Sequence, residues 1–214
     1  MRIVAGAAKG RRLTAPSSDR VRPTADRVKE ALFASLQPLL AGARVLDLYA
    51  GTGALGLEAL SRGAASVTFV ERDRAALDAL RRNIATVGLP GTHVVAADVA
   101  RAVFDDLPGA PYDLVVADPP YQLPRATVVS MLAALPPVLA DAAVVVLERS
   151  VREGDVTWPP GLRAGDPRRY GETVLLRAVL DRGPSSDTSA DATSDASADA
   201  TSDASAGAAH KEPS

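Results

Sequence analysis

The sequence predicts an α/β fold in which a mostly parallel sheet carries helices on both faces. Five short runs rich in β-branched and other apolar residues lie at 44–50, 66–71, 93–98, 112–118 and 142–148. Glycine, proline or charged residues bound each run, which is typical of buried strands. Helical patterns separate the runs, and strands that alternate with helices in this way form parallel sheets with right-handed crossovers.

The elements around these strands follow from local signals. Segments 2–6 and 11–15 predict a small hairpin at the start of the chain. A helix is predicted at 24–40, with Thr24 as its N-cap and one apolar stripe made of Val28, Leu32, Leu36 and Leu39. Further helices are predicted at 54–62, at 73–87, in a short segment after Asp98 and at 126–139. The run 172–180 predicts a last strand.

Composition excludes several classes of protein. The 214 residues suit one domain with an appendage, and 47% apolar content is enough for a core. The chain has no cysteine and two histidines, so we expect no disulfide and no metal site. No run approaches the roughly 20 apolar residues that span a bilayer, and the N-terminus lacks the apolar core of a signal peptide. We therefore expect a cytoplasmic protein without membrane contact, and a monomer.

Charge is distributed unevenly along the chain. Residues 1–30 hold eight bases and three acids, whereas 181–214 hold seven acids and two bases. The segment 181–214 also repeats DATSDASA in tandem, and such small polar residues cannot bury enough surface to order the chain. We expect a basic arm and helix at 1–40, a catalytic domain at 41–180 and a disordered acidic tail at 181–214. The tail is either a solvated appendage or an electrostatic mimic of nucleic acid.

A glycine-rich loop predicts a nucleotide-type ligand at one edge of the sheet. Gly51, Gly53 and Gly56 lie between the first strand and the next helix, where backbone approaches a ligand closely and the helix N-terminus offers free N–H groups. Glu71 ends the next strand, where an acid can accept hydrogen bonds from ribose hydroxyls. Asp98 ends the third strand. Ligands in open α/β sheets bind at the carboxyl ends of the strands, where all these residues are expected.

Asp47 separates two interpretations of this loop. The same glycine pattern, with an acid about 20 residues later, also describes a dinucleotide-binding domain. A negative charge four residues before Gly51 disfavours a pyrophosphate, but it suits a ligand that carries a positive amine and a sulfonium. S-adenosylmethionine (SAM) has both groups, and we predict it as the cofactor.

The motif DPPY follows the fourth strand and predicts a site for a planar amine. Its residues are Asp118, Pro119, Pro120 and Tyr121. The proline pair stiffens the backbone and fixes the direction of neighbouring carbonyls. The Asp118 carboxylate and the Pro119 carbonyl can accept the two hydrogens of an exocyclic base amine, and Tyr121 can stack on the base. The alternative is a tight turn whose residues are simply good turn formers.

Several motifs resemble those of the bacterial enzymes that methylate the 2-amino group of one guanine in 16S ribosomal RNA. They are DLYAGTGALGLEALSRGA, DPPY, RPTADRVKEALF, RIVAGAAKGRRL and RYGETVLLR, which together extend over residues 2–180. The resemblance implies a Rossmann-like class I SAM-dependent methyltransferase fold with seven strands, the last antiparallel. It implies that Asp47, Gly51 and Gly53 hold the methionine part of SAM, that Glu71 holds the ribose, and that Asp98 holds the adenine end. The acidic tail departs from the family pattern.

The basic arm predicts contacts with the phosphates of 16S ribosomal RNA, in the small ribosomal subunit or an assembly intermediate. The candidate side chains are Lys9, Arg11, Arg12, Arg20 and Arg22. The alternative is that these charges only solubilise the arm. A loop guanine can leave its stack and be read by its Watson–Crick edge. We expect direct in-line methyl transfer, because the absence of cysteine excludes covalent C5 methylation of pyrimidines.

Four other functions remain open from the sequence. A DNA adenine-amine methyltransferase would use the same DPPY motif. A glutamine-amide methylase typically has Asn where this chain has Asp118. An NAD-dependent oxidoreductase would use the glycine loop, and a non-catalytic RNA-binding assembly factor would use only the arm.

Overall fold

The computed structural model describes residues 1–15, 26–102 and 107–183, apart from the side chains of Asp26 and Arg27. Residues Met1–Gly183 form one compact unit. The predicted N-cap Thr24, the predicted RNA contacts Arg20 and Arg22, and nearly all of the acidic tail lie outside the described residues. The predicted division into segments 1–40, 41–180 and 181–214 stays a prediction.

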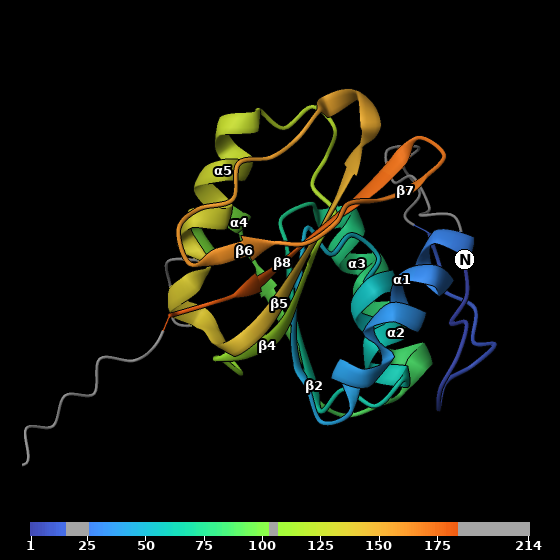
Figure 1. Ribbon diagram of the computed structural model, residues 1–214. Helices are drawn as coiled ribbons and strands as arrows, with labels where there is room; N and C mark the ends of the chain where they lie inside the picture. Colours follow the sequence, from blue (N-terminus) through green and yellow to red (C-terminus); the bar gives the residue numbers. More distant parts are fainter. Residues whose placement is uncertain (16–25, 103–106, 184–214) are drawn as a thin grey trace, which may run out of the picture. The chain divides into compact units, whose positions relative to one another are not determined.

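A single sheet forms the centre of this unit (Figure 1). Its strand order is β3-β2-β1-β4-β5-β8-β6, and β7 pairs with β8 outside this path. Strands β1 to β5 are parallel, and β8 runs antiparallel to β5. The strands are β1 (Arg44–Leu48), β2 (Ser66–Glu71), β3 (Thr92–Ala96), β4 (Tyr112–Ala117), β5 (Leu139–Ser150), β6 (Leu162–Ala164), β7 (Arg168–Tyr170) and β8 (Thr173–Leu180).

The predicted fold class is confirmed, with one more strand than expected. The described sheet has eight strands rather than seven, because two three-residue strands, β6 and β7, both pair with β8. Runs this short have no detectable apolar periodicity, and these two are rich in arginine, so they could not be recognised as strands from the sequence. The last strand is antiparallel, as the resemblance implied.

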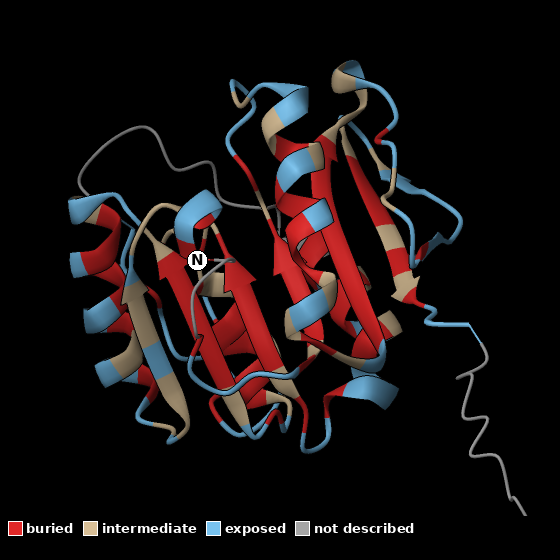
Figure 2. Cartoon of the chain, turned by 90° about the vertical axis from the view of Figure 1, so that its left-hand side faces the viewer, coloured by how far each residue is buried: buried red, intermediate tan, exposed pale blue. Residues whose placement is uncertain are grey.

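Helices cover both faces of the sheet (Figures 1 and 2). One core cluster joins α1 (Asp26–Leu40), α2 (Ala54–Ser61) and α3 (Arg74–Val87) to side chains such as Val67 and Val116. The other joins α4 (Val99–Ala102) and α5 (Arg125–Ala134) to side chains of the opposite face. Figure 2 shows the central strands buried along most of their length, while the edge strand β3 is partly exposed.

Two details of the helices differ from the predictions. In α1 the side chains of Val28, Leu32 and Leu36 are buried, but Leu39 is 38% exposed and Leu40 takes its place in the core. Helix α5 ends at Ala134, because a 3-10 turn at Pro136–Val138 (η1) replaces its last predicted turn. A second 3-10 turn, Val151–Glu153 (η2), follows β5.

The N-terminal arm, residues 1–15, is held against α2 by a buried carboxylate. The two predicted hairpin segments are joined by an antiparallel bridge between Arg2 and Arg12. Glu58 of α2 has no exposed surface and accepts hydrogen bonds from the backbone N–H groups of Val4 (2.8 Å) and Ala5 (3.0 Å). The Nζ atom of Lys29, itself 1% exposed, lies 3.6 Å from Glu58, and Arg62 pairs with the same carboxylate at 2.8 Å.

Candidate active site

The predicted ligand residues lie at the carboxyl edge of the sheet. Asp47 and the glycine loop follow from β1, Glu71 ends β2, Asp98 follows β3, and the DPPY motif follows β4. Because β1 is flanked by β2 and β4, the glycine loop lies between the ends of these two strands. The sheet thus brings together all nine positions predicted for cofactor and amine.

The three glycines of the loop have different roles. Gly53 has φ 78°, and a Cβ there would lie 2.4 Å from Cδ1 of Leu80. A Cβ on Gly56 would lie 2.4 Å from the ring of Phe69, so Gly56 allows α2 to pack closely on β2, whereas Gly53 allows the loop to pack closely on α3. At Gly51 a Cβ would meet only the Tyr49 carbonyl, at 3.9 Å. Gly51 is therefore the glycine that leaves open space for a ligand.

Asp47 is a buried carboxylate under this loop. Its side chain is 1% exposed, and Oδ2 accepts a hydrogen bond of 2.8 Å from the backbone N–H of Gly56. Burial raises the pKa of Asp47 to about 7, against the lowering effect of that hydrogen bond, and the nearby charge of Glu71 adds to the rise. A cationic ligand beside Asp47 would stabilise its ionised form.

Glu71 connects the end of β2 to the glycine loop. Its Oε2 accepts the N–H of Gly51 at 2.9 Å, and its Oε1 accepts the N–H groups of Arg72 (2.8 Å) and Asp73 (2.7 Å). A carboxylate offers about four acceptor positions, so one remains for a ribose hydroxyl. Asp73 in turn caps α3 by accepting the N–H of Ala76.

Asp98 lies at the outer end of the same edge. Its Oδ1 accepts the N–H of Ala100, and its Oδ2 pairs with Arg72 at 2.7 Å. The Asp98 side chain is 40% exposed. It is thus open to a ligand, but it already orders the start of α4.

The DPPY motif presents an acid, a rigid carbonyl and an aromatic side by side. Asp118 is partly buried, and its backbone N–H donates to the carbonyl of Leu48 at the end of β1 (3.4 Å). Pro119 is buried and Pro120 is exposed, and the carbonyl of Pro120 accepts the N–H of Leu123 in a turn. Tyr121 is 39% exposed, an unusual position for a large aromatic side chain.

Three other carboxylates influence the charge of Asp118. Burial, followed by the negative charges of Glu148, Asp47 and Glu153, raises the pKa of Asp118 well above the ordinary value. Glu148 lies on β5 beside Asp118, because β4 and β5 pair in register up to Ala117 and Leu147. This crowding of acids suits a site that binds a positively charged ligand.

Two residues of the edge were not predicted from the sequence. Tyr49 follows β1 with φ 58°, a left-handed conformation that favours glycine. Burial and the charge of Asp98 raise the pKa of Tyr49 to about 12. Glu148 is 6% exposed. In the sequence, Tyr49 could have been found from its position just before Gly51. Glu148 could have been found from its position at the end of the predicted strand 142–148.

The arm residues predicted to contact RNA fall into two groups. Lys9 and Arg12 are exposed. Arg11 is also exposed, but its guanidinium donates to the carbonyls of Thr86 and Val87 (the latter at 2.9 Å), which end α3. Within the part of the chain that the structure describes, the Arg11 side chain therefore has a hydrogen-bonded contact with α3 that the side chains of Lys9 and Arg12 do not have.

The residues at this edge fit SAM. Gly51 leaves room for close approach, the carboxyl groups of Asp47 and Asp118 could supply negative charge beside an amine and a sulfonium, and Glu71 keeps an acceptor position. The described residues hold no cluster of three potential metal ligands. None of the described helices is both long and apolar enough to cross a membrane.

The fold and this edge define a SAM-dependent methyltransferase. An Escherichia coli structure named as a candidate methyltransferase, yhhF, superposes with a TM-score of 0.75 at 33% identity, over 86% of this chain and 99% of that one. A Synechocystis magnesium protoporphyrin IX methyltransferase, solved with bound SAM, is 17% identical and shares the fold (TM-score 0.58, 72% and 79% of the two chains).

The chain belongs to the family described as Conserved hypothetical protein 95, whose model matches residues 1–178. A curated relative, Ribosomal RNA small subunit methyltransferase D of Escherichia coli K12, is 40% identical over 159 residues, which are 74% of this chain and 79% of the relative. The protein of the same name from Haemophilus influenzae is 40% identical over 123 residues, 56% of this chain and 64% of the relative.

Proposed function

We propose that the protein transfers the methyl group of SAM to the 2-amino group of a guanine in 16S ribosomal RNA. The observation that carries this proposal is the 40% identity to a small subunit rRNA methyltransferase over most of the chain. The DPPY motif, across the edge from the glycine loop, supports amine chemistry.

The residues that would hold SAM are those of the carboxyl edge. Gly51 and Gly53 provide the backbone near the methionine part, Asp47 provides negative charge, and Glu71 and Asp98 hold the ribose and adenine end. When bound, SAM supplies a methyl group activated by a positively charged sulfur. The acidic surroundings of Asp47 and Asp118 favour this cation over the pyrophosphate of NAD.

Asp118 and Pro119 would orient the guanine amine. The lone pair of an exocyclic amine is delocalised into the base, so the amine is a weak nucleophile. Hydrogen bonds from its two N–H groups to the Asp118 carboxylate and the Pro119 carbonyl direct the nitrogen at the methyl carbon. The nitrogen would gain the methyl group as the carbon–sulfur bond of SAM breaks and the sulfur becomes a neutral thioether, and it would lose one proton, which the Asp118 carboxylate could accept. Tyr121, exposed beside them, offers a face on which the base can stack.

The RNA substrate, the cellular location and the oligomeric state are part of the same proposal. The RNA substrate is 16S ribosomal RNA, free or within the small subunit or its assembly intermediate, and Lys9 and Arg12 are exposed for phosphate contacts. Arg20 and Arg22 are predicted to join them. The proposal places the protein in the cytoplasm as a monomer.

Mass spectrometry of ribosomal RNA tests this function. RNA from cells that lack the gene should lose one N2-methylguanosine of 16S RNA, and purified protein with SAM should restore it in vitro. Survival of every methylguanosine after deletion would refute the proposal. If purified protein binds the small subunit but transfers no methyl group, the result would favour a non-catalytic assembly factor. If it methylates adenine in DNA, the result would favour a DNA adenine-amine methyltransferase.

A further inference from the structure

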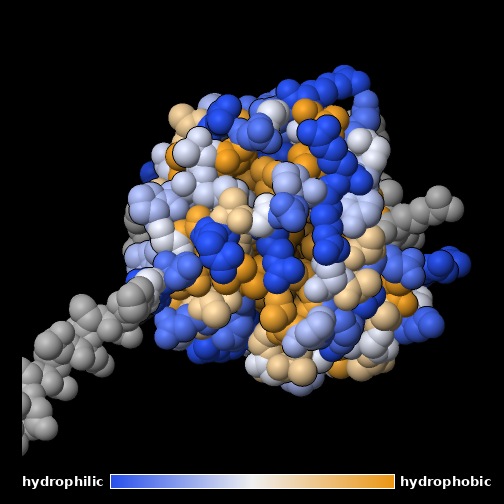
Figure 3. All heavy atoms as spheres, viewed as in Figure 1, coloured by the Kyte–Doolittle hydropathy of each residue, from blue (hydrophilic) through white to orange (hydrophobic). Residues whose placement is uncertain are grey.

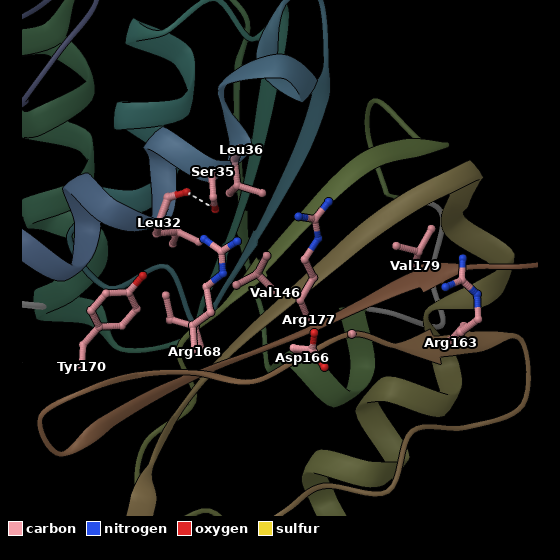
Figure 4. Close-up of a pocket in the computed structure, with 12 residues that line it drawn as sticks. Leu32, Ser35, Leu36, Val146, Arg163, Asp166, Arg168, Tyr170, Arg177 and Val179 are labelled. Carbon is pink, nitrogen blue, oxygen red and sulfur yellow. Dashed lines mark hydrogen bonds between the residues drawn. The ribbon is translucent and has the colours of Figure 1, made fainter.

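A groove lies on the face of the sheet that is covered by α1, and no residue of the glycine loop lines it. Its volume is about 290 Å³, and α1, β5, β6, β7 and β8 contribute to its walls (Figure 4). The floor is apolar and includes Val146, Leu175 and Val179. The volume of this groove is close to the lower end of the range, about 300–1,000 Å³, that is typical of pockets for small ligands.

The rim of this groove is cationic. Arg163, Arg168 and Arg177 line it, with Asp166 as the one acid among the described lining residues. Arg163 pairs with Asp181 at 3.3 Å, whereas within the described residues neither Arg168 nor Arg177 has an ion pair. Figure 4 shows the side chains of Arg168 and Arg177 directed to the same side as Ser35 of α1. Figure 3 shows hydrophobic surface between strongly hydrophilic side chains on this side of the molecule.

The groove and the predicted amine site lie near each other along β5. Val146 lies in its floor, and Glu148 is two residues further on the same face of the strand, about 7 Å away. Glu148 neighbours Asp118 across the β4–β5 pairing. At the same end, Tyr170 of β7 lines the groove and pairs in register with Thr173 of β8. The distance between the groove and the amine site is therefore short enough for neighbouring nucleotides of one RNA strand to reach both.

We propose that this groove binds a single-stranded nucleotide of the RNA substrate close in sequence to the methylated guanine. Nucleobases have apolar faces that pack on aliphatic and aromatic side chains, and phosphates pair with guanidinium groups. The apolar floor and Tyr170 match the base of a nucleotide, and Arg168 and Arg177, which have no ion pair among the described residues, match its phosphate. The inference rests on the proposed function, because it takes the RNA to be the substrate.

Two neutralising variants and one filling variant test the groove. Arg168→Gln and Arg177→Gln remove its charge, and Ser35→Phe, on a half-buried position of α1, places a ring in its space. Affinity of the full-length protein for a fluorescent single-stranded RNA is measured by anisotropy over a salt series. The double arginine variant should bind RNA on the order of tenfold more weakly. Its slope of log affinity against log salt should fall by about 0.7 for each phosphate that the protein no longer neutralises.

Initial rates complete the test. The double variant and Ser35→Phe should raise the KM for RNA with kcat and SAM affinity unchanged. Arg81→Gln is the matched control, because this exposed arginine of α3 pairs with Asp78 and lies outside the groove.

If wild-type protein transfers no methyl group to RNA, the proposed function fails, and the anisotropy measurement still decides whether the groove binds RNA. Unchanged RNA affinity in the double variant would overturn the inference. Tighter RNA binding would also overturn it, and would indicate that an acidic segment of the chain occupies the groove.

Discussion

The carboxylate of Glu71 accepts the backbone N–H of Gly51 at 2.9 Å, so the residue predicted for the ribose also holds the loop predicted for the methionine part. A single side chain at the end of β2 thus fixes the position of the loop after β1. The two predicted parts of the SAM site are thus joined in the protein without a ligand, and we expect a change at Glu71 to affect both.

Glu71→Gln should weaken SAM binding by roughly tenfold to a hundredfold, since a hydrogen bond to a charged acceptor contributes about 1.5–3 kcal/mol. Calorimetric titration with SAM measures the loss. Glu172→Gln is the control, because Glu172 is an exposed partner of Arg152 and lies just before β8. Wild-type SAM affinity in Glu71→Gln would remove Glu71 from the site.

Asp118→Ala should leave SAM binding in place while methyl transfer falls at least about a hundredfold, because the amine loses the acceptor that orients it. Rates with saturating SAM and RNA measure the effect. Asp113→Asn serves as the matched control on the same strand, since Asp113 pairs with Arg44 at the other end of β4. Undiminished transfer in Asp118→Ala would refute the assigned role.

The activity should decline as the pH falls, and it should do so at a higher pH than for an ordinary aspartate. Ionised Asp118 is the stronger acceptor for the amine and can take its proton, and burial and neighbouring acids raise the pKa of Asp118. The protonated, inactive form therefore becomes populated at a higher pH than for an ordinary carboxyl group. A profile of kcat/KM against pH measures this limb. An acid limb at the ordinary pKa of aspartate would contradict the arrangement.

Asp47 should make the unliganded protein less stable as the pH rises from about 4 to about 7. Its folded-state pKa is raised from 3.8 to about 7, so over this range the folded state holds a proton that the unfolded state has released. The loss amounts to at most about 4 kcal/mol. Urea denaturation at several pH values measures it, and Asp47→Asn should flatten the dependence. SAM affinity should rise with pH over the same range in wild type but not in Asp47→Asn.

The basic side chains of the arm should separate into contacts with RNA and contacts with the fold. Lys9→Gln and Arg12→Gln should weaken RNA binding and leave the melting temperature unchanged, because both side chains are exposed. Arg11→Gln should lower the melting temperature, because it loses the hydrogen bonds to the end of α3. Equal effects of all three on RNA binding alone would contradict this division.

The strands β1 to β5 and their ligand-edge residues could be predicted because each strand contains a short, mainly apolar run that is followed by a glycine or ends in an acid. The contacts of Lys29 and Glu58 could not be predicted, because both residues fall at helical positions where charge normally indicates a solvent-exposed face. Their burial depends on an arm that folds back onto α2, a long-range contact with no local signal. The groove was missed for the same reason, since its walls come from helices and strands far apart in the sequence.

The docked arm has a practical consequence for work with this protein. The carbonyl of Met1 accepts the N–H of Leu13 at 3.0 Å, and the Met1 sulfur lies 3.8 Å from Oγ1 of Thr52, between the glycines of the loop. An affinity tag or reporter fused to the first residue would thus be attached to a residue that contacts the loop. Assays of cofactor affinity should use fusions at the other end, and affinities measured with an N-terminal tag should be compared with those of untagged protein.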